Sequence, residues 1–160
     1  MHPRLENEKV ALEAVKVLMP LEHQISKSGL GESLIYLVKL RASQINGCAY
    51  CIDMHSKDLR AMGETEQRLY ELDAWRETPF YSDRERAALA WTEAVTLISE
   101  GHVPDEVYDE ARKCFSESEL VNLTLAVIAI NSWNRLSISF RKEPGSYQPA
   151  KKTSGGEQAA

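Results

Sequence analysis

The apolar residues of this 160-residue chain recur three and four positions apart, and no stretch shows the one-by-one alternation of a half-buried β-strand. Trp91, Val95 and Ile98, for example, fall on one face of a helix. This spacing predicts an all-α protein with about seven or eight helices joined by short loops.

Capping signals and chain-breaking residues indicate where these helices begin and end. Residues 82–85 and 116–119 are capping boxes, in which a serine is followed three positions later by a glutamate. Pro20 is expected to end or kink the first helix, because proline lacks a backbone N–H. The helices expected from these signals span residues 6–19, 32–45, 48–62, 64–75, 82–99, 105–114 and 120–140. The last is apolar on several sides, which predicts a central position or a place in a subunit interface.

Composition narrows the class of protein. Apolar residues make up 43% of the chain and charged residues 27%, as in ordinary globular proteins. The net charge of −5 argues against nucleic acid and against an anionic membrane surface as partners. No apolar run reaches the length of a membrane span, and the N-terminus does not resemble a signal peptide, so a cytoplasmic protein with reduced thiols is expected. We expect one domain over residues 1–142 and a flexible tail over 143–160, which is rich in Pro, Gly, Ser and Lys.

The strongest chemical signal is a pair of cysteines followed by a histidine. Cys48 and Cys51 are separated by two residues, and His55 comes four positions after the second cysteine. On a helix these three side chains share one face, close to the helix N-terminus. The positive end of the helix dipole favours a thiolate, and His55 can add charge as an imidazolium or accept a proton. The pattern therefore predicts a reactive dithiol that forms a reversible disulfide, with one thiol pKa below the free value of about 8.5.

Other interpretations of these cysteines remain open. Two cysteines on one helical face can be small core residues. A zinc site would need further ligands, and only Cys114, His23 and His102 remain, at distant and unpaired positions. A structural disulfide is disfavoured without a secretory signal. We expect Cys114 to be structural, and we expect neither a metal nor a bound cofactor.

Residues 40–51 together with His55 resemble the core motif of the AhpD-like alkylhydroperoxidases, within the carboxymuconolactone decarboxylase superfamily. Residues 90–94 and 131–135 resemble further parts of the same branch, and the resemblance spans roughly residues 15–141. It implies an AhpD-like helical bundle that assembles as a homo-oligomer, either a trimer or a hexamer.

The resemblance also implies a thiol peroxidase activity. Cys51 would attack the peroxide and become a sulfenic acid, Cys48 would resolve it as a disulfide, and His55 would belong to a proton relay. The partners implied are a peroxide substrate and an external dithiol reductant, which is a dihydrolipoyl protein in some relatives. Two other functions remain open: a carboxymuconolactone decarboxylase-like enzyme, and a non-enzymatic redox sensor, since sensors use the same kind of thiol.

The sequence departs from the family pattern at two positions. Tyr50 stands where the best-known members have a histidine, and Tyr36 stands where they have a glutamate. A tyrosine can form a hydrogen bond but is a poor base near neutral pH, because its ordinary pKa is about 10. Tyr36 and Tyr50 are candidates for the substrate pocket, and Tyr50 is expected to form a packed wall of it.

Glu93 is the candidate that replaces the missing glutamate of the relay. It lies in the middle of a predicted helix among apolar neighbours, where a carboxylate needs a partner or a role. In this interpretation Glu93 holds His55 in position. The alternative is a solvated helix face or an interhelical salt bridge.

Overall fold

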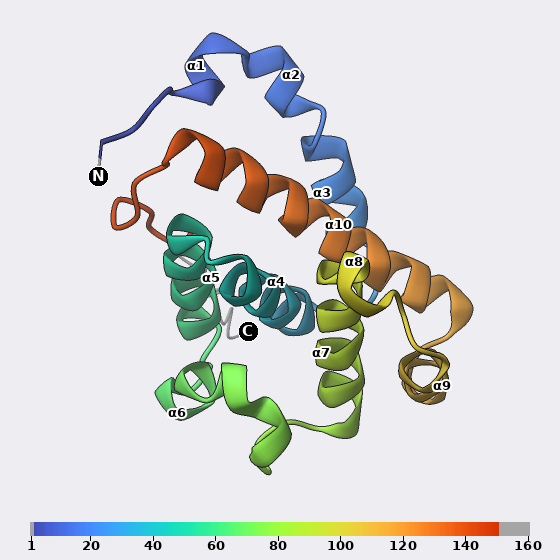
Figure 1. Cartoon of the computed structure of the whole chain (residues 1–160). Helices are drawn as coiled ribbons and strands as arrows, with labels where there is room; N and C mark the ends of the chain where they lie inside the picture. Colours follow the sequence, from blue (N-terminus) through green and yellow to red (C-terminus); the bar gives the residue numbers. More distant parts are fainter. Residues whose placement is uncertain (1, 151–160) are drawn as a thin grey trace, which may run out of the picture.

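The computed structural model describes residues 2–150, and all regular structure in this range is helical (Figure 1). The elements, in chain order, are α1 (Asn7–Val10), α2 (Leu12–Lys16), α3 (Met19–Ser26), α4 (Glu32–Asn46), α5 (Ala49–Ala61), α6 (Glu66–Tyr70), the 3₁₀ helix η1 (Leu72–Glu77), α7 (Asp83–Thr96), α8 (Ile98–Gly101), α9 (Asp105–Cys114) and α10 (Glu117–Phe140). The prediction of an all-α fold is confirmed.

The centre of the molecule is α4, which packs against α5, α7 and α10. Its residues Leu37, Val38 and Leu40 are each at most 1% exposed, because neighbouring helices cover it on several sides. The long helix α10 crosses α4 and also contacts α3, α5, α7 and α9 (Figure 1). The prediction of a central position for this apolar helix is therefore confirmed, although Val121 and Ile128 on α10 remain exposed.

Both capping boxes form as the sequence predicts. Ser82 accepts a hydrogen bond from the backbone of Glu85 at the start of α7, and Ser116 accepts one from the backbone of Glu119 at the start of α10. In each box the glutamate side chain bonds back to the backbone N–H of the serine. Each box thus pairs two backbone N–H groups that would otherwise lack a partner at the start of its helix.

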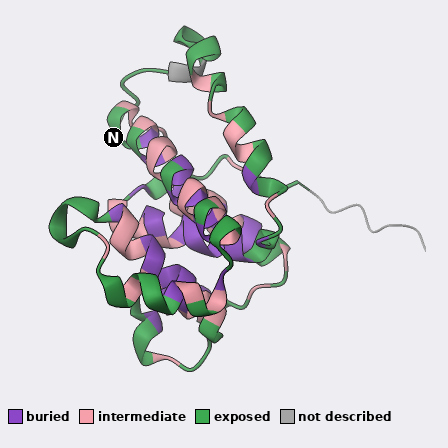
Figure 2. Ribbon diagram, turned by 90° about the vertical axis from the view of Figure 1, so that its right-hand side faces the viewer, coloured by how far each residue is buried: buried purple, intermediate pink, exposed green. Residues whose placement is uncertain are grey.

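The N-terminal region differs from the prediction of one helix over residues 6–19. Two short helices form there, and α3 begins at Met19 with Pro20 in its first turn. Proline is well tolerated at that place, because the first N–H groups of a helix have no partner within the helix. Val10 and Val17 are each 68% exposed, so this region buries little of its apolar surface (Figure 2).

Two other predicted helices are each divided in two, and the first part of the predicted tail is bonded to α5. The helix predicted over 64–75 is instead α6 followed by η1, and the helix predicted over 82–99 is α7 followed by α8. Residues 143–150, predicted as part of a flexible tail, make hydrogen bonds to α5. The rest of that tail, residues 151–160, lies outside the described residues.

Candidate functional site

A tight turn between α4 and α5 carries the two cysteines. Gly47 ends α4 with φ of 69°, a left-handed conformation that glycine adopts without the steric cost of a Cβ. Cys48 is the N-cap of α5, and Cys51 lies in its first turn. The Asn-Gly turn signal in the sequence therefore places both sulfurs at a helix N-terminus.

Asparagine side chains hold this turn against α10. Asn46 Nδ2 donates hydrogen bonds to Asn131 Oδ1 at 3.0 Å and to Asn134 Oδ1 at 2.9 Å. Asn134 Nδ2 in turn donates to Ser43 Oγ at 3.0 Å. Asn134 is fully buried, so these bonds form away from competing water. The dithiol is thereby fixed to a rigid support.

The two thiols are buried and in contact with each other. Cys48 and Cys51 are each 1% exposed, and their sulfurs are 2.6 Å apart. The Cys51 thiol also faces Ser137 Oγ of α10 at 3.8 Å. Both cysteines are free, and only a small movement separates them from a disulfide.

The contact between the thiols changes their acidity in opposite directions. The hydrogen bond with Cys51 lowers the pKa of Cys48 to about 7, against the opposing effect of burial. The same hydrogen bond, together with burial, raises the pKa of Cys51. The pair therefore loses one proton near neutral pH and holds the second one tightly. Because the sulfurs are adjacent, the remaining proton can lie on either of them.

His55 lies on the same face of α5 as the cysteines and is only 3% exposed. Neither ring nitrogen has a hydrogen-bond partner among the described residues. Burial lowers the pKa of His55, although Asp58 opposes this shift. A neutral imidazole is thus favoured at neutral pH, so the predicted role of His55 as an imidazolium is disfavoured and its role as a proton acceptor is retained.

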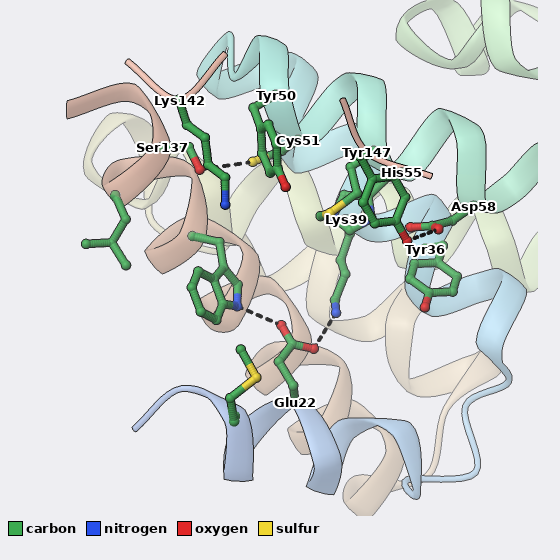
Figure 3. A pocket seen from close by; sticks show the side chains of 14 residues that line it. Glu22, Tyr36, Lys39, Tyr50, Cys51, His55, Asp58, Ser137, Lys142 and Tyr147 are labelled. Atoms are coloured by element: carbon green, nitrogen blue, oxygen red, sulfur yellow. Dashed lines mark hydrogen bonds and ion pairs between the residues drawn. The ribbon is translucent and has the colours of Figure 1, made fainter. Parts of the chain in front are cut away.

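Asp58 is the carboxylate beside His55. Its Oδ2 lies 3.5 Å from His55 Nδ1, at the outer limit of a hydrogen bond. Its Oδ1 accepts a hydrogen bond of 2.6 Å from the hydroxyl of Tyr147, which belongs to the C-terminal segment (Figure 3). The tilted ring of Tyr36 lies 5.7 Å from that of His55. These four residues form what we call the His55 cluster: Tyr36, His55, Asp58 and Tyr147.

A pocket of about 310 Å³ opens in front of this cluster. Cys51 and all four residues of the His55 cluster line it, and Tyr50 is part of its wall. Cys48 does not line it but borders a second cavity of about 390 Å³, beside Arg141 and Pro144. The two sulfurs therefore face different spaces, and only Cys51 shares a pocket with His55.

An ion pair that the sequence analysis did not find also lines the pocket. Lys39 Nζ lies 2.5 Å from Glu22 Oε2, and Trp133 Nε1 donates to Glu22 Oε1 at 3.0 Å (Figure 3). Lys39 is only 6% exposed, although lysine side chains are rarely buried. The ion pair forms because α3, which carries Glu22, packs against α10 and brings this carboxylate within reach of Lys39 on α4.

Glu93 lies outside this pocket, in a separate ion-pair cluster. Its carboxylate accepts hydrogen bonds from Arg41 Nε and Trp75 Nε1, both at 2.8 Å, and from Arg76 at 2.5 Å. Burial opposes ionisation, but the bonds from Trp75, Arg76 and Arg41 outweigh it and hold the pKa of Glu93 below its ordinary value. The prediction that Glu93 positions His55 is therefore corrected: Glu93 forms an interhelical salt bridge. We call these four residues the Glu93 cluster.

The tyrosines at the two departures from the family pattern both lie in the pocket wall. Burial, and then the charge of Asp58, raises the pKa of Tyr36, so it remains protonated at neutral pH. The Tyr50 ring lies 4.3 Å from Lys142 Nζ. Tyr36 is thus not a base near neutral pH, and Asp58 is the carboxylate that the sequence analysis missed. The signal for it was its position three residues after His55, on the same helical face.

Residues 2–150 contain neither a group of metal ligands nor a membrane-spanning helix. No three His, Cys, Asp or Glu side chains in this range gather as metal ligands would. None of the helices formed there is both long enough and apolar enough to cross a bilayer. Cys114, the last residue of α9, packs against a different core cluster from the one that contains Cys48 and Cys51.

The fold and the dithiol turn define the class of this protein. Its residues 13–94 match the model of the Carboxymuconolactone decarboxylase family, and the chain belongs to that family. Among curated proteins it is 47% identical over 139 residues to the uncharacterized protein YdfG of Bacillus subtilis (strain 168), across 87% of this chain and 95% of that one.

Solved structures have the same fold. One is a protein of unknown function from Agrobacterium tumefaciens, with a suggested role as the antioxidant defence protein AhpD. It is 44% identical, covers 91% of this chain and 100% of its own, and superposes with a TM-score of 0.88. The debrominase Bmp8 is 21% identical, with a TM-score of 0.73 over 81% of this chain and 70% of its own, which is a likeness of fold alone.

Proposed function

We propose that this protein is a thiol-dependent peroxidase that reduces peroxides, including alkyl hydroperoxides, through a cycle of the Cys48–Cys51 dithiol and disulfide. The observation that carries this proposal is the pair of free thiols, 2.6 Å apart, of which Cys51 shares a pocket with His55. The His55 ring is neutral, and within residues 2–150 neither of its nitrogens has a hydrogen-bond partner. A neutral imidazole is the base such chemistry needs near pH 7.

The first step is attack by the Cys51 thiolate on one oxygen of the peroxide. The O–O bond breaks, Cys51 becomes a sulfenic acid, and the other oxygen leaves as an alkoxide that takes a proton to become an alcohol. His55 receives the Cys51 proton and returns it to this leaving group. The contact with Cys48 and burial raise the pKa of Cys51, so formation of this thiolate depends on His55 as the base.

The second step is attack by Cys48 on the sulfenic sulfur, which forms the disulfide and releases water. Cys48 is suited to it because its sulfur is already adjacent and its pKa is lowered. An external dithiol, of the dihydrolipoyl kind, then reduces the disulfide by thiol–disulfide exchange and becomes oxidised in its place. No bound cofactor is needed for this cycle.

We also propose that the chain assembles as a homo-oligomer. Val121, Ile128 and Ile138 on α10 are 61%, 46% and 44% exposed, and a second copy would cover such apolar side chains. The measurement is the mass in solution by light scattering. A mass equal to that of one 18.0 kDa chain at micromolar concentration would contradict this part of the proposal.

The test of the peroxidase proposal is mass spectrometry after one equivalent of peroxide, followed by turnover with a dithiol reductant. Loss of two hydrogens from the intact chain, with repeated consumption of peroxide, is the expected result. A disulfide that forms once without turnover would favour a redox sensor. Activity on a carboxymuconolactone that persists in Cys51→Ser would favour a decarboxylase-like enzyme.

A further inference from the structure

We propose that Tyr147, on the C-terminal segment 143–150, is a positioning residue of the dithiol site. Its hydroxyl holds Asp58 so that His55 keeps its proton on Nδ1 and leaves Nε2 as the basic atom. The inference deepens the proposed function and rests on it for the chemistry that Nε2 performs. The segment follows α10 in the chain, and no part of the dithiol motif predicts its involvement.

The two carboxylate oxygens of Asp58 face different residues. Oδ1 accepts the Tyr147 hydroxyl at 2.6 Å, while Oδ2 faces His55 Nδ1 at 3.5 Å. Asp58 is 7% exposed, so little water can take the place of the phenol. A carboxylate fixed at one oxygen cannot rotate freely, and its other oxygen favours the histidine tautomer that carries the proton on the facing nitrogen.

The phenol is a permanent donor in this arrangement. Burial, and then its hydrogen bond to Asp58, raises the pKa of Tyr147, so the hydroxyl keeps its proton across the range in which thiols react. His55 is itself kept neutral by burial. A neutral imidazole with one nitrogen protonated has one basic nitrogen, and the tautomer decides which one it is.

A clamp on α5 holds the segment in place. Lys57 Nζ donates to the backbone oxygens of Gly145 at 3.2 Å and Tyr147 at 3.0 Å, and it pairs with Asp53 Oδ2 at 2.9 Å. The Gly145 N–H donates to the same Asp53 oxygen at 3.0 Å. Gly145 has φ of 103°, where a side chain would be strained, so glycine suits this turn. The clamp thus fixes the backbone on either side of the phenol.

Other charged or titratable groups act on members of the His55 cluster from α3 and α4, and any test must leave them unchanged. They are Glu22 on α3, and Glu32, Tyr36 and Lys39 on α4. Tyr147→Phe alters none of them and removes one oxygen atom. It is therefore the variant that isolates the hydrogen bond.

The experiment reads the tautomer of His55 by long-range ¹H–¹⁵N NMR of the reduced protein, without any peroxide. In the wild type we expect a protonated Nδ1 and an unprotonated Nε2. In Tyr147→Phe we expect a mixture of tautomers, and a fall in the rate of peroxide-driven disulfide formation of about tenfold to a hundredfold. The matched control is Tyr70→Phe, at a tyrosine that is 71% exposed on α6, and it should match the wild type in both measurements.

Lys57→Met provides a second test that keeps the phenol and loosens the clamp. It should shift the tautomer in the same direction but less, whereas Lys113→Met, which breaks an exposed ion pair with Glu110, should not. An unchanged His55 spectrum in Tyr147→Phe overturns the proposal, and an unchanged spectrum in Lys57→Met overturns the role of the clamp. Absence of peroxide turnover in the wild type contradicts the proposed function instead, because the tautomer measurement does not depend on it.

Discussion

The Glu93 cluster and the His55 cluster each place a carboxylate among aromatic and titratable neighbours, yet their polar atoms are satisfied to very different degrees. Glu93 accepts three hydrogen bonds, from Arg41, Trp75 and Arg76, so its charge is fully compensated. In the other cluster His55 is 3% exposed, and neither of its ring nitrogens has a hydrogen-bond partner among the described residues.

The two clusters show how a polar side chain that stabilises the fold differs from one that is available for chemistry. A carboxylate held by two arginines and an indole has no capacity left for a substrate, so it stabilises the contact between α4, η1 and α7. A buried imidazole with no polar contact, among the described residues, closer than the 3.5 Å approach of Asp58 to Nδ1 costs stability, and it is retained where a ligand or a proton completes it. The incomplete cluster, and not the more highly charged one, is therefore where we expect chemistry.

The largest effect is expected at the sulfur that faces the pocket. Cys51→Ser should abolish peroxide-driven oxidation, because serine cannot form a sulfenic acid. Cys48→Ser should still react but retain one added oxygen, since no resolving thiol remains. Intact mass spectrometry after one equivalent of peroxide measures both. Disulfide-type loss of two hydrogens in Cys48→Ser would show that the pairing of the two thiols is wrong.

The next test asks whether the incomplete cluster is functional. His55→Gln should slow peroxide-driven disulfide formation near pH 7 by about 10²- to 10⁴-fold, the usual contribution of a general base. The defect should shrink at high pH, where the thiolate forms without help. Stopped-flow kinetics across pH measure it. A pH-rate profile that superimposes on that of the wild type would show that His55 takes no part in the mechanism. The His55 cluster would then be no more functional than the Glu93 cluster.

A smaller effect concerns the thiol pair itself. Iodoacetamide should alkylate Cys48 with a midpoint near pH 7, because the hydrogen bond with Cys51 lowers its pKa to about 7. In Cys51→Ala this bond is lost and burial still opposes ionisation, so the pKa of Cys48 should rise toward the ordinary value of about 8.5. The thiolate fraction at pH 7 then falls by about an order of magnitude, and alkylation slows with it. Equal midpoints in the two proteins would assign the low pKa to the helix end.

The smallest effect on chemistry is expected in the Glu93 cluster. Glu93→Gln should leave the rate of disulfide formation within about twofold of the wild type, because the pocket does not include it. It should lower the free energy of unfolding by about 2 to 4 kcal/mol, since Arg41 and Arg76 lose the negative charge that they face. Urea denaturation measures the second quantity, and a large kinetic defect without loss of stability would reverse the two assignments.

The same variant has a pH signature. The pKa of Glu93 is lowered on folding from an ordinary 4.5, so its stabilisation is present above that value and is lost as the pH falls through the folded pKa. The difference in unfolding free energy between wild type and Glu93→Gln should therefore be full at pH 6 and should shrink in acid. A difference that stays constant down to pH 2 would show that Glu93 is not ionised in the fold.

The sequence by itself determined the elements whose causes are local. The capping boxes at Ser82 and Ser116, the turn at Gly47 and the shared face of Cys48, Cys51 and His55 follow from contacts within a few residues. Asp58 was within reach of the same reasoning, because it lies three residues beyond His55 on one helix. Such features are set by helix geometry and backbone hydrogen bonding, which the order of residues fixes directly.

Only the tertiary structure decided which side chains meet across long distances in the chain. Glu93 and His55 were placed together by analogy, but α7 turns Glu93 toward Arg41 and Trp75 instead. Tyr147 lies 89 positions from Asp58 in the chain, and Glu22 lies 111 positions from Trp133. No local pattern encodes such pairs, because they form only when the packing of α4, α5 and α10 has fixed where each helix face points.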